Sequence, residues 1–258
     1  MTPQTVHLRR LAREQARIEA ELQSVALAEL QRAWRDVRMR LKQLDDQRPK
    51  TGQKTRLRKE AYFHADLWST VTERLKSRLL EKIKGGALSL VAINNEYLLS
   101  VMGDGIELDT EAFANTYSEL LGQRITKTTD VIRSSTSRKI VSWYNTPGRT
   151  LGDITGELSA DFGDTRAERI ARTEIAYLDD NVQNEVAEQL GIKAWWWSSK
   201  QDSEVCTRKL IGPDGQEYKG CRELHGKRFT MDQPGPPKGS HPNCRCDKIL
   251  ILESRDKP

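Results

Sequence analysis

The chain has 258 residues, of which 31% are charged and 36% hydrophobic, and its mean hydropathy is -0.69. This composition is polar for a compact globule and predicts long helices with large solvated faces. The sequence contains no run of 18 apolar residues, which excludes a membrane-spanning helix, and its arginine-rich start lacks the apolar core of a signal peptide. We therefore expect the chain to stay in the cytosol where it is made.

The net charge of +5 is unevenly distributed. Residues 1–60 hold 15 Lys and Arg against 8 Asp and Glu, residues 61–191 hold 14 against 20, and residues 192–258 hold 13 against 9. Basic ends around an acidic middle favour contact with nucleic acid or with an acidic protein surface. A solvated helix face rich in arginine explains the same pattern, so charge alone leaves the partner open.

Residues 5–45 are predicted to form one long amphipathic helix. Arginine and glutamate fill its polar faces, and apolar side chains recur three and four residues apart. Those apolar residues are Leu8, Leu11, Ile18, Leu22, Val25, Leu30, Val37, Leu41 and Leu44. Such a stripe needs a partner helix, and packing on the chain's own second helix is favoured over a helix of another chain. Pro49 and Gly52 predict the end of the helix.

A second helical stretch is expected from about residue 56 to residue 84, with a break at Gly85-Gly86. Residues 87–102 are predicted to be helical again, and Gly103 to Gly105 form the next turn. Two more helices are expected at residues 109–122 and 124–143, closed by Pro147-Gly148. Residues 1–149 are thus predicted to be a helical domain.

From residue 150 the sequence no longer predicts long helices alone. A short helix over 151–162 and a longer one over 166–190, capped by Asp164 or Thr165, are followed by loss of the helical period. Residues 194–197 and 248–252 are predicted strands, each apolar on successive residues and so expected to be covered on both faces. The predicted fold class is mainly α, with a small α+β module at residues 150–258 organised by zinc.

All four cysteines fall within 41 consecutive residues near the C-terminus, and they are Cys206, Cys221, Cys244 and Cys246. In a reducing cytosol this clustering favours a metal over disulfides. His241 lies three residues before Cys244, a spacing that lets both side chains face one ion. Cys244 and Cys246 would point to the same side of an extended strand. Zinc takes four thiolate or imidazole ligands, so five candidates compete for four places.

The preferred ligands are Cys206, Cys221, His241 and Cys244, with Cys246 in place of His241 as the main alternative. A structural zinc ion would supply the cross-link that about 55 residues with little helix cannot obtain from apolar burial. Free buried thiols or a Cys206–Cys221 disulfide are the competing interpretations. A lone histidine near a turn, His225, is interpreted as a hydrogen-bonding residue.

Two further features of the C-terminal half could carry chemistry. The pairs Glu168–Arg172 and Arg169–Thr173 lie four residues apart, which favours contacts along the helix's own surface over catalysis. A more specific hypothesis is that Arg172 and Glu174 attach this helix to the zinc module or to a partner. The run Trp195 to Trp197 favours the core of a small module over base stacking or a protein interface. Phosphate-binding, dinucleotide and hydrolase motifs do not occur in the sequence, so we assign no catalytic residue.

The order of these motifs resembles the Mu F-type phage head morphogenesis domain. The resemblance covers roughly residues 120–252, and its most specific part is His-Pro-Asn-Cys-Arg-Cys at 241–246. The other matching positions are Arg-Ile-Ala-Arg-Thr-Glu at 169–174, the tryptophan strand, Asp202, Cys206, Cys221, Leu224, Gly226 and Pro236-Pro237. The family commonly has a second cysteine three residues after the first, where this chain has Lys209, and this departure leaves the ligand set open.

The resemblance implies a minor head protein of a tailed phage, present in few copies and not an enzyme. Such a protein associates with the portal vertex, enters the procapsid in the host cytoplasm, influences DNA packaging or ejection, and remains in the virion. The predicted structural or interaction residues are Arg172, Thr173, Glu174, Asp202, Trp195 and Trp197.

Two alternative functions remain open. One is a metal-dependent nuclease, in which His225 or His241 activates water. The other is a DNA-binding protein that uses the basic residues of 1–60 and the tryptophans.

Overall fold

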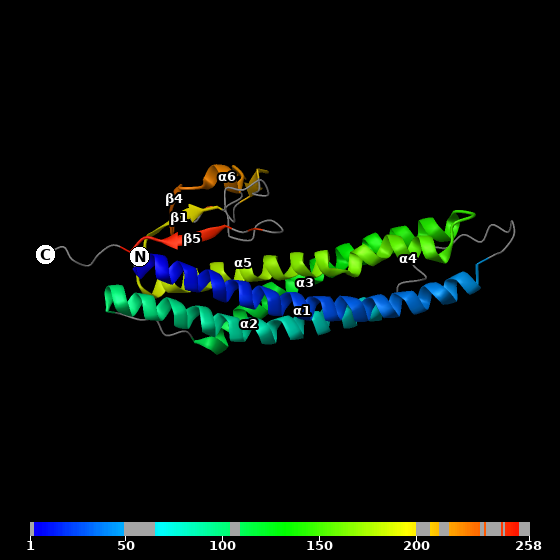
Figure 1. Cartoon of the computed structure of the whole chain (residues 1–258), viewed down its shortest axis with the longest axis horizontal. Coiled ribbons are helices and arrows are strands. Elements are labelled where there is room, and N and C mark those ends of the chain that lie inside the picture. Colours follow the sequence, from blue (N-terminus) through cyan, green and yellow to red (C-terminus); the bar gives the residue numbers. More distant parts are fainter. Residues whose placement is uncertain are drawn as a thin grey trace. The chain divides into compact units, whose positions relative to one another are not determined.

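A computed structural model describes residues 3–48, 65–103, 109–199, 207–211, 217–232, 235, 244 and 246–252 (Figure 1). The helices are α1 (Pro3–Asp46), α2 (Ala65–Met102), α3 (Thr110–Asn145), α4 (Leu151–Ser159), the 3-10 turn η1 (Ala160–Phe162), α5 (Asp164–Gln189) and α6 (Cys221–Leu224). The strands are β1 (Ala194–Ser198), β2 (Leu210–Ile211), β3 (Glu217–Tyr218), β4 (Arg228–Thr230) and β5 (Asp247–Leu250). Long helices followed by a small strand module confirm the predicted fold class, whereas the organisation of that module by zinc stays a prediction.

The chain divides into two compact units. The helical unit consists of Leu22–Glu81 and Asn115–Glu168, and the sheet-bearing unit consists of Met1–Glu21, Lys82–Ala114 and Arg169–Pro258. The predicted division between residues 149 and 150 does not coincide with this grouping. The reason is that α1, α2, α3 and α5 each contribute residues to both units.

Two predicted helix breaks are wrong, because α2 continues through Gly85-Gly86 and α3 continues through Gly122. Gly86 is buried, and a Cβ placed on it would lie only 3.0 Å from Cγ2 of Ile18 in α1. The glycine therefore serves the close approach of α1 to α2 and does not end the helix. A glycine inside a helix costs about 1 kcal/mol relative to alanine, which the packing of long apolar stripes offsets.

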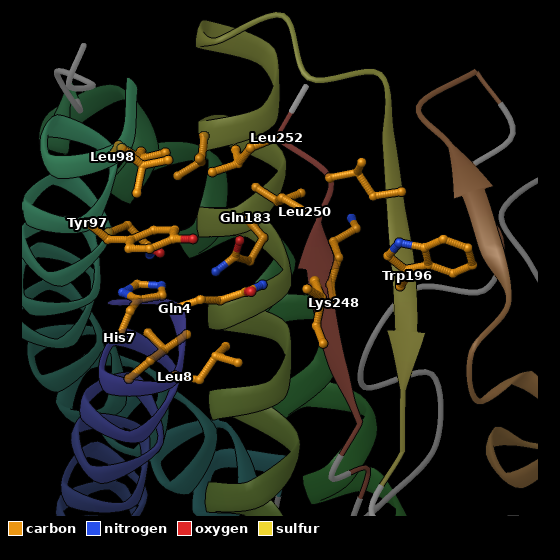
Figure 2. Close-up of a pocket in the computed structure, with 16 residues that line it drawn as sticks. Gln4, His7, Leu8, Tyr97, Leu98, Gln183, Trp196, Lys248, Leu250 and Leu252 are labelled. Atoms are coloured by element: carbon orange, nitrogen blue, oxygen red, sulfur yellow. The ribbon is translucent and has the colours of Figure 1, made fainter. Parts of the chain in front are cut away.

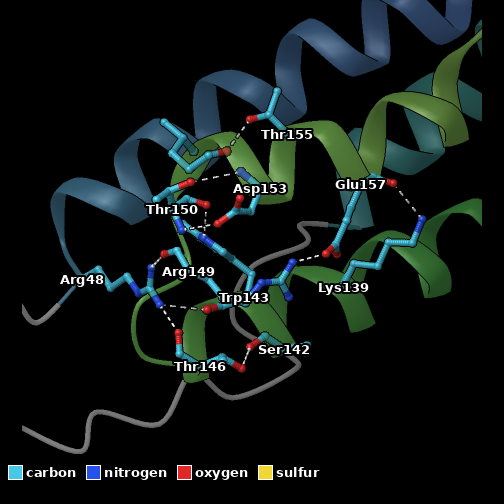
Figure 3. Close-up of polar contacts among 11 residues, drawn as sticks. Arg48, Lys139, Ser142, Trp143, Thr146, Arg149, Thr150, Asp153, Thr155 and Glu157 are labelled. Carbon is cyan, nitrogen blue, oxygen red and sulfur yellow. Dashed lines mark hydrogen bonds and ion pairs between the residues drawn. The ribbon is translucent and has the colours of Figure 1, made fainter.

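The helical unit is built around buried side chains from α1 to α5. Phe162 of η1 stacks on Trp34 and Trp68, with ring centroids 5.3 and 6.3 Å apart. Arg48, just beyond α1, donates to the backbone carbonyls of Trp143, Thr146 and Arg149 (Figure 3). The next helix, α4, begins with a capping box in which Thr150 and Asp153 satisfy each other's backbone amides. These contacts hold the turn between α3 and α4.

The sheet-bearing unit contains a three-stranded antiparallel sheet in the order β4-β1-β5. Trp195 of β1 is opposite Leu250 of β5, and Trp196 is opposite Ile249. In Figure 1 the sheet lies over α5, with β5 next to that helix. The pairing of β1 with β5 confirms both predicted strands. Because β1 is central and β5 is at an edge, one side of β5 carries no neighbouring strand among the described residues.

Candidate metal centre

The three described cysteines come from two places in the sheet-bearing unit. Cys221 is the first residue of α6, a single turn that begins after Gly220. Cys244 and Cys246 precede β5, which fixes their position because β5 is paired along its length with β1. The sheet thus brings together two segments that are more than 20 residues apart in sequence.

The sulfur atoms of Cys221, Cys244 and Cys246 all lie within 4.8 Å of one another. Each side chain is buried, with exposed fractions of 0%, 4% and 2%, and no disulfide joins any two of them. In a tetrahedral zinc site with Zn–S bonds of about 2.3 Å, neighbouring sulfurs are about 3.8 Å apart. The cluster therefore has the donor type and spacing for three ligands of one metal ion.

Contacts within the cluster change the acidity of the thiols. Hydrogen bonding to Cys244 and Cys246, together with burial, raises the pKa of Cys221 far above the ordinary thiol range. The hydrogen bond with Cys221 lowers the pKa of Cys246, but hydrogen bonding to Cys244 and burial outweigh it and raise that pKa to about 12. Without a metal Cys221 and Cys246 are therefore neutral thiols near pH 7. A bound cation would have to displace their protons.

Aromatic side chains pack against the cysteines. Trp195 and Trp197 are each 2% exposed and belong to the same buried cluster as the three cysteines and Ala176 of α5. Phe229 of β4 stacks on Trp195 with a centroid separation of 4.8 Å. These contacts confirm for Trp195 and Trp197, but not for Trp196, the prediction that the tryptophans form the core of a small module.

The expectation that both strands are covered on both faces is wrong for β1. Its central residue, Trp196, is 41% exposed, because successive side chains of a strand point to opposite faces and only one face of this strand packs on the cysteine cluster. Position 196 therefore belongs to the outer face of the sheet.

The structure describes only some of the other residues that the sequence suggested for this site. Cys206, His241 and Asp202 lie outside the described residues, so the choice between His241 and Cys246 as partners of Cys206, Cys221 and Cys244 stays a prediction. Among the described residues Cys221 forms no disulfide, so the structure gives no support to the alternative Cys206–Cys221 bond. His225 accepts a hydrogen bond at Nδ1 from the backbone N–H of Ser199, at 3.1 Å, in agreement with a hydrogen-bonding role.

Arg172 contacts α1. Its Nε donates to Oε1 of Glu19 at 2.9 Å, and both residues line a cavity of about 180 Å³ beside Cys244 and Cys246. Glu174 is 2% exposed within α5, and the Thr173 hydroxyl donates to the carbonyl of Arg169. One partner of Arg172 is thus a neighbouring helix at the border of the cysteine cluster.

One residue that sequence reasoning missed attaches the sheet to α5. Lys248 of β5 is 8% exposed; its Nζ lies 3.4 Å from Asp180, donates to Asn184, and lies 4.7 Å from the centroid of the Trp195 ring. A lysine inside an apolar strand was the available signal, because a buried ammonium group needs a partner. The partner's identity depends on the packing of β5 against α5.

Comparison with known proteins adds no relative: no protein-family model, no curated protein and no solved structure matches the chain. In the described part of the chain, no helix has both the length and the apolar character needed to cross a bilayer.

Proposed function

We propose that the chain is a metal-stabilised minor head protein of a tailed phage, which acts at the portal vertex during procapsid assembly. The observation that carries the metal part of the proposal is the buried cluster of Cys221, Cys244 and Cys246. The assembly role rests on the resemblance of the motif order around those cysteines to Mu F-type head morphogenesis domains.

The donor set fits zinc. Three buried thiols suit a borderline-soft ion that prefers thiolate and imidazole, and they do not suit calcium or magnesium, which prefer oxygen. Cys206 or His241 would supply the fourth ligand. With four protein ligands the ion would be closed to substrate and structural, linking α6 to the start of β5.

A structural ion explains how the strand module is stable. Its strands are two to five residues long, and short strands of this kind bury too little apolar surface to fold independently. A metal that bridges α6 and β5 closes the loops between them. The module would then offer a rigid surface on the end of the helices, as an assembly protein requires.

The first experiment measures metal content by elemental mass spectrometry on the full chain purified without a histidine tag. We expect about one zinc per chain in the wild type and loss of the metal in Cys221→Ser and Cys244→Ser. Ser203→Ala is the matched control, since a hydroxyl is not among the proposed ligands, and it should retain the metal. Metal-free wild-type protein with free thiols would overturn the metal part of the proposal.

The assembly role needs a separate test. Co-expression with the portal protein encoded by the same genome, followed by sedimentation, should give a stable complex that contains both chains. Incubation of the purified chain with double-stranded DNA and magnesium or manganese should give no cleavage. Absence of any portal complex would contradict the proposed role, and metal-dependent cleavage would favour the nuclease alternative.

A further inference from the structure

A partly open apolar groove lies at the free edge of β5, in the sheet-bearing unit. Its volume is about 380 Å³, and its walls come from the start of α1, the end of α2, α5, and residues 248–252 of and beyond β5. We call it the β5 groove. Figure 2 shows Tyr97, His7 and Leu8 on the helical side and Lys248 and Leu250 on the strand side.

One wall of the β5 groove consists of strand backbone. The N–H of Ile251 donates to the carbonyl of Ala194 in β1, at 3.0 Å. Peptide groups along an antiparallel strand alternate in direction, so the N–H and C=O of Leu250 point away from β1, toward the side without a neighbouring strand. Five consecutive residues from Lys248 to Leu252 line the groove, as expected for a cavity that follows a strand edge.

The floor of the groove holds a side-chain amide that hydrogen-bonds to no described residue. Gln183 of α5 is 5% exposed, and the hydrogen bonds among the described residues include none to its side-chain amide. In Figure 2 this amide points toward the Tyr97 side of the groove. Asn94 of α2, also 5% exposed, donates from its N–H₂ group to the carbonyl of Leu90, and no described residue donates to its side-chain oxygen. Neither amide is among the fully buried side-chain groups that lack a partner, so both are accessible from the groove and can hydrogen-bond to a ligand with peptide-like groups.

The charges of the groove are compensated. Lys248 is paired with Asp180, and burial together with the nearby Arg10 lowers the pKa of His7, which leaves its ring neutral near pH 7. The His7 ring stacks on Tyr97 with a centroid separation of 4.2 Å. Exposed apolar side chains stand at the rim, with Leu8 at 38%, Trp196 at 41% and Val101 at 50%. The groove therefore suits an uncharged apolar ligand.

We propose that the β5 groove binds a short extended apolar segment of a partner protein, which adds to the sheet as a strand beside β5. Backbone groups of the segment pair with Leu250 and with the amide of Gln183, and alternate apolar side chains enter the cavity between α1 and α2. Strand addition at an open sheet edge derives affinity from main-chain hydrogen bonds and specificity from side-chain pockets. The inference depends neither on the bound metal nor on the portal role.

The occupant is a peptide and not a small hydrophobic molecule because of the backbone wall. A fatty acid or an aromatic compound could fill the apolar volume, but it would leave the peptide groups of Leu250 unpaired. An extended chain satisfies them and the Gln183 amide together. The following test distinguishes a peptide occupant from a small-molecule occupant.

The test uses the full chain as bait for a displayed library of random heptapeptides, followed by synthesis of the enriched sequences. We expect apolar residues at alternate positions and saturable binding measured by fluorescence anisotropy. Leu250→Pro should weaken binding at least tenfold, since it removes an outward N–H without breaking the bonds from β5 to β1. Gln183→Leu should also weaken binding, and bound peptide should slow amide hydrogen exchange at residue 250.

The controls separate edge pairing from nonspecific adhesion. Leu99→Ala removes a side chain that is 55% exposed on α2 but outside the groove, and it should bind as the wild type does. Two series of peptides are compared, methylated either on the odd or on the even backbone nitrogens. Only the series whose methyl groups replace the N–H groups that face β5 should lose binding. Equal binding by Leu250→Pro, equal binding by both methylated series, or no enrichment over empty support would each overturn the proposal. Decanoic acid that binds while no peptide does would assign the groove to a small molecule.

Discussion

Nε of Arg172 in α5 donates to Oε1 of Glu19 in α1 at 2.9 Å, beside the cavity that Cys244 and Cys246 line. The side chains are 29% and 28% exposed, so the pair is partly screened by water. Arg172 belongs to the Arg-Thr-Glu motif on which the family resemblance rests, and its geometry gives that motif a structural role. It ties α5 to α1 at the point where the cysteine cluster begins.

A double-mutant cycle of Arg172→Ala and Glu19→Ala should give a coupling free energy of about 1 kcal/mol in urea unfolding, because the pair is only partly exposed. The matched control is the more exposed pair of Arg17 and Glu21, one turn apart in α1, for which about 0.3–0.5 kcal/mol is expected. Arg172→Ala should leave the metal content unchanged. Loss of metal in that variant would show that Arg172 supports the cysteines directly.

Metal affinity should decrease steeply as the pH is lowered from 8 to 6. The pKa of Cys246 is about 12 and that of Cys221 is raised further, so both thiols are protonated across this range and must release protons to bind the ion. With three cysteine ligands the apparent affinity should fall by up to about a thousandfold per pH unit. Competition with a chromogenic chelator at several pH values measures this slope, and a flat profile would place the metal at other ligands.

Lys248→Met should destabilise the protein by about 3 kcal/mol, because it leaves the carboxylate of Asp180 buried without its cation. The double variant Lys248→Met, Asp180→Leu should recover much of this loss, since both charges are then removed. Urea unfolding followed by tryptophan fluorescence measures the differences. A double variant as unstable as the sum of the two single variants would contradict a coupled pair.

The two adjacent glycines of α2 should respond oppositely to substitution. Gly85→Ala should stabilise the protein by about 0.5–1 kcal/mol, since a Cβ there meets nothing within 4 Å and alanine favours the helix. Gly86→Val should destabilise it by about 1–3 kcal/mol, because its side chain would press on Ile18. Thermal unfolding compares the two variants. Equal effects would mean that α1 does not approach α2 closely at Gly86.

The sequence predicted several elements correctly because the signals for them are local. The apolar stripe from Leu8 to Leu44 predicted α1, and the period of residues 166–190 predicted α5. The runs at 194–197 and 248–252 predicted β1 and β5, since strand formers between turn residues need no distant information. The cysteine positions likewise identified a candidate metal site, because ligand type is a property of the residue itself.

Tertiary structure alone decided how these elements meet. Gly85-Gly86 and Gly122 have the local signature of helix breaks, yet α2 and α3 continue through them because long-range packing outweighs a local cost of about 1 kcal/mol. The approach of Cys221 to Cys244 and Cys246, and the pairing of Lys248 with Asp180, depend on the register of β5 against β1 and on the packing of the sheet on α5. Such contacts join residues far apart in sequence, and no local pattern encodes them.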